Sequence, residues 1–337
     1  MKAQSLFFTN PYEIEIQEKT LAPLDPGEML VRTQLSAISP GTELLIYRGH
    51  APTELAADEN IAALSGSLVF PLQYGYAAVG TVIEAGDDLS PKWIDRTVFS
   101  FQPHQTHFIT TPEQVIPLPE GISPQSAVFL PNMETAVNFL MDGHPLIGER
   151  VAVFGQGIVG LLTTALLSKF PLKDLLTLDL YPNRLAASLD AGAMQSFDPN
   201  NATTFSQVRG EKGIDLVYEL SGSPKSLDQA ISVTGFAGRV VVGSWYGRKR
   251  VSLNLGGHFH RSRIQIISSQ VSSLAPSISG RWDKSRRFDL AWEMIRQVQP
   301  ERWITHRLPF QQAAQGYRLL DQNPKEVIQV LLDYTQT

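Results

Sequence analysis

Three glycines in the stretch VAVFGQGIVG are spaced so that the backbone between them could bind phosphate groups. Gly155 can form a tight turn, Gly157 leaves room for a diphosphate, and Gly160 lets the next helix pack close to the strand. Ile158 and Val159 begin that helix, whose first N–H groups would face the phosphates. The spacing predicts dinucleotide binding. The alternative is a turn that serves only to pack a strand on a helix in an unrelated α/β domain.

A carboxylate stands where dinucleotide binding needs one. The apolar segment LLTL ends at Asp179, 19 residues after Gly160. A carboxylate there would accept hydrogen bonds from both hydroxyls of an adenosine ribose. Its charge would repel a 2′-phosphate, so Asp179 favours NAD(H). Arg184 lies five residues later and could bind that phosphate, which keeps NADP(H) as the alternative.

Strands and helices alternate around the glycine motif, as a parallel sheet covered on both faces requires. We expect strands at residues 151–154, 175–178, 215–220, 238–242 and 264–269, and helices at 127–141, 158–168, 182–192, 224–235 and 286–298. The predicted fold class is therefore an α/β Rossmann domain with a doubly wound parallel sheet, spanning residues 125–299.

Residues 1–124 instead contain short strands at close spacing, which is typical of a compact, β-rich, barrel-like domain. Strands are expected at residues 13–17, 28–38, 76–84, 97–101, 107–111 and 114–118. Residues 52–64 could form a short amphipathic helix that covers the active site, or a decorative insertion. The helix expected at 311–322 and the strand at 327–332 suggest that residues 300–337 return to this domain, which would make it discontinuous.

The totals narrow the class of protein. The chain has 337 residues, a net charge of −5 and no cysteine, which excludes disulfides, thiolate nucleophiles and zinc sites built on cysteine. We expect a cytoplasmic protein that binds neither membranes nor nucleic acids. The segment from Arg248 to Arg287 carries about +8. That segment is either a solvated rim or subunit contact, or a surface that attracts an anionic substrate or the cofactor phosphates.

Five segments spread over almost the whole chain match motifs of one known family. They are SPGTE at Ser39, YGYAAVG at Tyr74, GERVAVFGQG at Gly148, DLVYELSG at Asp215 and THRLPF at Thr305. These segments resemble the medium-chain dehydrogenase/reductase superfamily, which includes the zinc-type alcohol dehydrogenases. The resemblance implies a GroES-like barrel domain beside the Rossmann domain, NAD(P)-dependent oxidoreductase activity and a homodimer. Within the superfamily, the chain is similar to bacteriochlorophyllide and sorbitol-type dehydrogenases.

The chain departs from that family at the metal ligands. The family's catalytic zinc is held by a cysteine, a histidine and a third ligand, and the matching positions here are Pro40, Tyr76 and, approximately, Pro131. Proline offers no ligand atom and a neutral tyrosine is a poor ligand, so we expect no metal. Two histidine pairs could be imagined as ligands instead: His104 with His107, and His258 with His260. No carboxylate accompanies either pair, and ordinary loop histidines are the favoured interpretation.

Without zinc, another group must protonate or stabilise the oxygen that gains charge. Tyr76 is the first candidate, because its hydroxyl should point to the reacting centre; otherwise it only fills the space of the metal. Thr42 matches the family's proton-relay hydroxyl, and Glu43 matches an acidic position that could pair with an arginine. His50 could shuttle protons at the mouth of the cleft, since histidine titrates near neutral pH, or could lie in a surface loop.

Further residues are expected beside the cofactor. Thr135 matches a family threonine near the nicotinamide. The others close the third strand or follow the fourth: Ser221, Gly222, Gly243, Ser244, Trp245 and Tyr246. Trp245 and Tyr246 could stack on a planar substrate, or merely line an apolar pocket.

The sequence thus predicts a zinc-independent oxidoreductase that transfers hydride between NAD(H), with NADP(H) as the alternative, and a small alcohol or carbonyl substrate. Reduction of an activated C=C bond or a quinone is the alternative reaction, since solvent could then protonate the product. A nucleotide-binding regulatory protein without activity is the alternative from a different class.

Overall fold

Successive residues of the strand that precedes the glycine motif point into two different cores. Val151 and Val153 of β8 (Arg150–Phe154) lie in one apolar cluster, and Ala152 and Phe154 lie in another. Because side chains alternate between the two faces of a strand, the sheet is buried on both faces, as parallel sheets are. Helices close both cores: α3 (Leu130–Gly143) and α4 (Ile158–Leu167) the first, α6 (Thr204–Arg209) and α7 (Pro224–Val233) the second.

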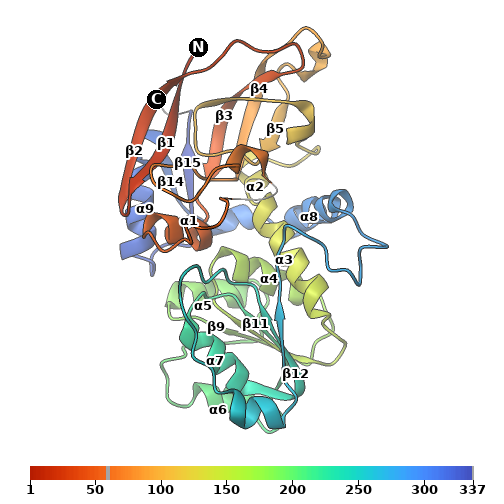
Figure 1. Cartoon of the computed structure of the whole chain (residues 1–337). Coiled ribbons are helices and arrows are strands. Elements are labelled where there is room, and N and C mark those ends of the chain that lie inside the picture. The colour runs from red at the N-terminus through yellow and green to blue at the C-terminus, as the bar shows by residue number, and fades with distance from the viewer. Residues whose placement is uncertain (58–60, 336–337) are drawn as a thin grey trace. The chain divides into compact units, whose positions relative to one another are not determined.

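Six parallel strands make up this sheet in the order β10–β9–β8–β11–β12–β13. Of these strands, β9, β11 and β12 are labelled in Figure 1. The other strands are β9 (Asp174–Leu178), β10 (Gln195–Phe197), β11 (Ile214–Glu219), β12 (Thr234–Val242) and β13 (Gln265–Ser268). This is the doubly wound order of a Rossmann domain, in which the strand order reverses between β8 and β11. The predicted α/β Rossmann fold class is confirmed, and the glycine turn follows β8 at that switch point.

The structure, a computed structural model, describes residues 1–57 and 61–335 and divides into two units. Unit 1 comprises Met1–Pro131 and Gln299–Thr337, and unit 2 comprises Asn132–Val298. The boundaries were predicted after residues 124 and 299. In the structure α2 (Pro124–Ala127) lies against strands β3 and β4, so it belongs to unit 1 and the first boundary moves to residue 131.

A seven-stranded mixed sheet and a separate hairpin form the β part of unit 1. The hairpin joins β1 (Lys2–Asn10) to β2 (Glu13–Thr20). The sheet runs β14–β15–β3–β4–β5–β7 with β6 beside β3, and of its described strands only β14 and β15 pair in parallel. Its strands are β3 (Met29–Ala37), β4 (Ala78–Ala85), β5 (Thr97–Ser100), β6 (His107–Thr110), β7 (Val115–Pro117), β14 (Ile304–Pro309) and β15 (Gln329–Asp333). The C-terminal strands thus complete a sheet begun near the N-terminus.

Some helices agree with the sequence prediction and others do not. The predicted helix at 52–64 is wrong, because residues 53–57 form turns, bends and an isolated β-bridge from Ala56 to Ser67, and Ala62–Leu64 form a single 3₁₀ turn. Residues 58–60 lie outside the described part of the chain. An unpredicted helix, α1 (Pro40–Tyr47), begins with proline in its first turn. The remaining α-helices are α5 (Pro182–Asp190), α8 (Lys284–Val298) and α9 (Ala313–Gln322). None of the described helices is both long and apolar enough to cross a membrane.

A buried ion pair joins α8 to α3 within unit 2. The Arg287 guanidinium is inaccessible to solvent and donates to Glu134 Oε1 from Nη2 at 2.7 Å and from Nε at 3.0 Å. It also donates to Asn138 Oδ1 at 2.7 Å and to the carbonyl oxygen of Val271. Burial raises the pKa of Glu134 even though the charge of Arg287 lowers it. The carboxylate is therefore tolerated in this core only because the guanidinium faces it.

Replacing Arg287 should destabilise unit 2 more than any surface change. In Arg287→Met the Glu134 carboxylate loses its buried cation, and we expect a loss of about 3–5 kcal/mol in the free energy of unfolding. Since burial raises the pKa of Glu134, lowering the pH from 8 to 5.5 should protonate that carboxyl in the variant. The loss in the free energy of unfolding relative to the wild type should then become smaller. Urea denaturation followed by tryptophan fluorescence measures both. The matched control is Arg286→Met, at the exposed neighbouring position, which should change stability by less than about 0.5 kcal/mol. Equal losses for the two variants would contradict the assignment.

Candidate functional site

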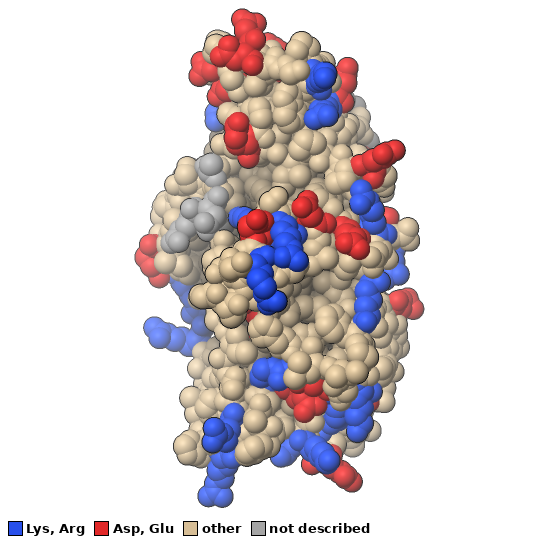
Figure 2. All heavy atoms as spheres, turned by 90° about the vertical axis from the view of Figure 1, so that its right-hand side faces the viewer, with Lys and Arg blue, Asp and Glu red and all other residues tan. Residues whose placement is uncertain are grey.

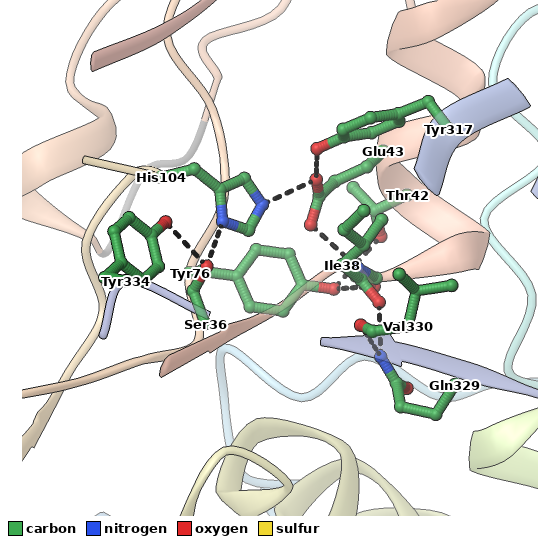
Figure 3. Close-up of polar contacts among 11 residues, drawn as sticks. Ser36, Ile38, Thr42, Glu43, Tyr76, His104, Tyr317, Gln329, Val330 and Tyr334 are labelled. Carbon is green, nitrogen blue, oxygen red and sulfur yellow. Dashed lines mark hydrogen bonds and ion pairs between the residues drawn. The ribbon is translucent and has the colours of Figure 1, made fainter. Parts of the chain in front are cut away.

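One buried carboxylate organises the polar part of unit 1 (Figure 3). Glu43 lies in α1, is inaccessible to solvent and accepts three hydrogen bonds. The donors are the backbone N–H of Ser39 at 2.8 Å, His104 Nε2 at 3.0 Å and the Tyr317 hydroxyl. A buried carboxylate needs such donors, because removing it from water costs on the order of several kcal/mol. The arginine partner expected for Glu43 was wrong: a histidine and a tyrosine take that place.

Both ring nitrogens of His104 have partners. Nδ1 lies 2.7 Å from Ser36 Oγ, which in turn lies 2.8 Å from the Tyr334 hydroxyl. In one consistent arrangement Tyr334 donates to Ser36, Ser36 donates to Nδ1, and Nε2–H donates to Glu43. Gly75 makes room for the ring, since its φ is +121° and a Cβ there would lie 2.8 Å from His104 Cδ2. His104 is fully buried, so its interpretation as a loop histidine at the surface was wrong.

The two tyrosines of this network are permanent donors. Burial raises the pKa of Tyr317 well above its usual value, and the Glu43 carboxylate raises it further. Burial likewise raises the pKa of Tyr334. Both phenols therefore keep their protons through the neutral range, and the network supplies hydrogen bonds toward Glu43 from several sides.

Tyr76 lies beside this network (Figure 3). Its hydroxyl shares a short hydrogen bond with the Ser39 hydroxyl and donates a long one, 3.4 Å, to Thr42 Oγ1. The ring is half-buried. The structure thus brings three of the four predicted catalytic residues together, Tyr76, Thr42 and Glu43. The fourth, His50, lies at an exposed position after the end of α1.

The other histidines named in the sequence analysis do not gather into a metal site. His107 lies on β6 and is half-buried, and burial, helped by the charge of Arg32, lowers its pKa. His258 lies in unit 2, where Nε2 is 2.7 Å from the Thr234 carbonyl oxygen. Among the residues that the structure describes, no three His, Cys, Asp or Glu side chains form a group that could hold a metal ion.

The glycine turn of unit 2 leaves open space where the motif predicts a ligand. Gly155 has a φ of +90°, and a Cβ on Gly160 would lie 2.0 Å from the carbonyl oxygen of Gly155. At Gly157, in contrast, no atom of the described residues lies within 4 Å of the position that a Cβ would take, apart from those of Gly157 and its chain neighbours. Gly157 is also the N-cap of α4, whose first residues are the buried Ile158 and the half-buried Val159. Unpaired N–H groups of a helix N-terminus therefore border a space free of side chains, which fits a diphosphate.

Asp179 follows β9 and is hydrogen-bonded to the glycine turn. Its Oδ2 accepts from the backbone N–H of Gln156 at 2.7 Å, and its Oδ1 accepts from that of Tyr181 at 3.0 Å. Each carboxylate oxygen keeps capacity for a second hydrogen bond, so the group remains suited to ribose hydroxyls. Arg184 lies on α5 with its guanidinium 5.0 Å from the ring centroid of Tyr181.

A second buried carboxylate, Glu219, ends β11 and was not among the predicted site residues. It accepts hydrogen bonds from the backbone N–H of Ser221 at 2.8 Å, from the Ser221 hydroxyl, and from the Tyr246 hydroxyl at 2.6 Å. Burial and then the Glu219 carboxylate raise the pKa of Tyr246, which keeps that phenol a donor. The sequence offered one sign of this carboxylate, a single acid within the otherwise apolar run LVYEL.

The remaining predicted cofactor residues surround this carboxylate or lie on neighbouring elements. Ser244 Oγ accepts from the backbone N–H of Gly222 at 2.8 Å and donates to the Glu219 carbonyl oxygen at 3.2 Å. The other three lie on α3, directly after β12 and in the loop that follows: Thr135, Gly243 and Trp245. These hydrogen bonds connect the C-terminal ends of β11 and β12, at the same edge of the sheet as the glycine turn.

Not every cation of the basic segment 248–287 lies free at the surface. Arg287 is buried against Glu134, and Lys249 Nζ donates to the carbonyl oxygen of Gly222 at 2.8 Å. On the face shown in Figure 2, Lys and Arg side chains are interspersed with Asp and Glu side chains. Attraction of an anionic substrate by this segment stays a prediction.

Known proteins resemble this chain over nearly its whole length. The family model described as "Zinc-binding dehydrogenase" matches residues 159–288. The starvation-sensing protein RspB of Escherichia coli K12 is 23% identical and aligns with 99% of this chain and 100% of its own. D-guloside 3-dehydrogenase of the same strain is 22% identical over 90% of this chain and 92% of its own. The crystal structure described as short chain alcohol dehydrogenase (rspB) from E. coli CFT073, complexed with cofactor NADH, matches with a TM-score of 0.79 at 19% identity over 99% of both chains.

A methyl group at Gly157 tests whether the open space at the glycine turn binds cofactor. In Gly157→Ala the added methyl meets no atom of the described residues beyond its chain neighbours, so the melting temperature should stay at the wild-type value. The methyl would occupy the space in which the motif predicts the diphosphate. We therefore expect the NADH dissociation constant to rise at least about tenfold. Fluorescence titration measures it. The control is Gly27→Ala in unit 1, which also meets open space and should leave both quantities unchanged. Wild-type NADH affinity in Gly157→Ala would place the diphosphate elsewhere.

Proposed function

We propose that this chain, as an NAD(P)-dependent oxidoreductase of the medium-chain dehydrogenase/reductase superfamily, transfers hydride between the nicotinamide and an alcohol or carbonyl substrate without a zinc ion. The observation that carries the proposal is the Tyr76 hydroxyl. It stands at a zinc-ligand position of the family and is hydrogen-bonded to Ser39 and Thr42.

The donor set at the ligand positions does not fit a zinc ion. A catalytic zinc needs three protein ligands and one open position. Pro40 and Pro131 offer no side-chain ligand atom, which leaves Tyr76 alone. His104, the imidazole of the network, already has hydrogen-bond partners for both ring nitrogens, Glu43 and Ser36. Proton transfer by the tyrosine is therefore the chemistry that these residues support.

In the reduction direction, the nicotinamide would deliver its hydride to the carbonyl carbon while the Tyr76 hydroxyl gives its proton to the carbonyl oxygen. The long hydrogen bond to Thr42 supports this role, because a 3.4 Å contact is weak and can be exchanged for one to a substrate oxygen. In the oxidation direction, the same oxygen would accept the proton of the alcohol. Reduction of an activated C=C bond, the alternative reaction, would not need Tyr76 as an acid.

For the cofactor we propose NAD(H). Asp179 is fixed by two backbone N–H groups at the end of β9, where its charge would disfavour a 2′-phosphate. Arg184 could bind a 2′-phosphate and would then favour NADP(H), but its guanidinium stacks on the ring of Tyr181.

Removing one oxygen atom from Tyr76 tests its role as the acid. Tyr76→Phe should lower kcat for carbonyl reduction about 10²-fold or more and leave the NADH dissociation constant unchanged. A panel of ketones and aldehydes, followed by loss of NADH absorbance, supplies the substrate and the rate. Tyr12→Phe removes an exposed phenol from the same unit and should keep the wild-type rate.

Two results would contradict the proposal. Activity abolished by a chelator and restored by zinc, with one zinc per chain in elemental analysis, would show metal catalysis. A wild-type rate of ketone reduction in Tyr76→Phe would remove the tyrosine from the chemistry, and turnover with enones alone would point to C=C reduction.

Neutralising Asp179 tests the cofactor preference. Asp179→Asn keeps an oxygen for the N–H of Gln156 but removes the charge, so binding of NADPH should improve relative to NADH by about tenfold. Paired fluorescence titrations with the two cofactors give the ratio. Asp190→Asn, at an exposed position on α5, provides the control for a change in net charge. An unchanged ratio would show that Asp179 does not set the preference.

A further inference from the structure

Ser39 occupies a helix N-cap without using its side chain as a cap. It precedes Pro40, the first residue of α1, and its hydroxyl accepts no hydrogen bond from the helix. Ser123 makes a direct comparison, because it also precedes a proline that begins a helix. There the hydroxyl accepts from the backbone N–H of Ser126 at 3.1 Å, as a capping serine does. The same dipeptide therefore serves two different purposes in unit 1.

Glu43 fixes the Ser39 backbone from the helix side. Its Oε1 accepts from the backbone N–H of Ser39 at 2.8 Å, which resembles the glutamate half of a capping box. The carboxylate itself cannot shift, because His104 and Tyr317 hold its other oxygen in a site closed to solvent. Glu43 thus holds the backbone of Ser39 in place, while the Ser39 hydroxyl makes no capping hydrogen bond to the helix.

The hydroxyl of Ser39 is directed to Tyr76. The two oxygens share a short hydrogen bond, and Ser39 is 9% exposed, so water competes little for it. Because Tyr76 donates toward Thr42, the consistent assignment has Ser39 donating to the tyrosine oxygen. A hydrogen bond of this kind strengthens when the accepting oxygen becomes charged.

We infer that Ser39 is a positioning residue of the reaction, whose hydroxyl orients Tyr76 and stabilises the phenolate formed when Tyr76 gives its proton to the substrate. The inference rests on the proposed function. In the full step the electron pair of the hydride forms the new C–H bond, and the electron pair of the carbonyl π bond takes the Tyr76 proton. The phenolate that remains accepts the Ser39 hydrogen bond. Solvent reprotonates the phenolate after product leaves.

The test compares Ser39→Ala, Ser39→Thr and Ser123→Ala in the full chain. Ser39→Ala should lower kcat for ketone reduction about 10- to 100-fold, since a hydrogen bond to a charged group is lost. KM, the NADH dissociation constant and the melting temperature should stay at wild-type values, because this hydroxyl caps no helix. Ser39→Thr keeps the hydroxyl and should restore most of the rate. Ser123→Ala should show the reverse pattern, a lower melting temperature with an unchanged kcat.

Two further readouts separate this role from a structural one. For alcohol oxidation, which needs the phenolate, the pH at half-maximal kcat should move upward by about one unit in Ser39→Ala. The double variant Tyr76→Phe/Ser39→Ala should be no slower than Tyr76→Phe, because Ser39 acts only through the tyrosine oxygen.

Three outcomes would overturn the inference. A wild-type kcat and pH profile in Ser39→Ala, with Tyr76→Phe impaired, would remove Ser39 and leave the proposed function standing. A lower melting temperature with no rescue by Ser39→Thr would make the hydroxyl structural. A wild-type rate in Tyr76→Phe would instead defeat the proposed function, and the inference with it.

Discussion

The burial of the Glu43 carboxylate is the constraint on which the polar network of unit 1 depends. A charge closed off from solvent must be matched by donors, and losing one of them would leave an uncompensated group in the interior. The donors come from three separate parts of the chain: the residue before α1, the loop before β6, and α9 near the C-terminus. Satisfying one carboxylate therefore fixes several segments of unit 1 against one another, and with them the loop that carries Tyr76.

The Rossmann half was predictable because its signals are local. β8, β9 and β11 lie within a residue of their expected bounds, since apolar runs ending at glycine or an acid mark such strands well. β10, of three residues, has too few to show a period. α1 was missed because Pro40 and Gly41 are typical of a turn, and only the tertiary contacts of Glu43 show why a helix begins there.

The polar network was not predictable, because its members are far apart in sequence. Glu43 lies 61 residues from His104 and 274 from Tyr317, and neither pairing has a periodic signal. His104 stands among the polar residues QPHQT, which suggest a surface loop. It is buried because Gly75 leaves room for the ring and Ser36 and Glu43 satisfy its two nitrogens. Resemblance to the family located Tyr76 and Thr42 but could not show what holds them.

Each unit contains a buried carboxylate that is stabilised by the same kinds of hydrogen-bond donor. Glu43 accepts from a serine N–H and a tyrosine hydroxyl, and so does Glu219. In each case the carboxylate and burial raise the pKa of the tyrosine, so Tyr317 and Tyr246 are fixed as donors. A tyrosine bonded to a buried carboxylate is a poor acid, because ionising it would place two negative charges side by side. The Tyr76 hydroxyl shares hydrogen bonds with the hydroxyls of Ser39 and Thr42, and the proposal that Tyr76 exchanges a proton with substrate rests on these two contacts.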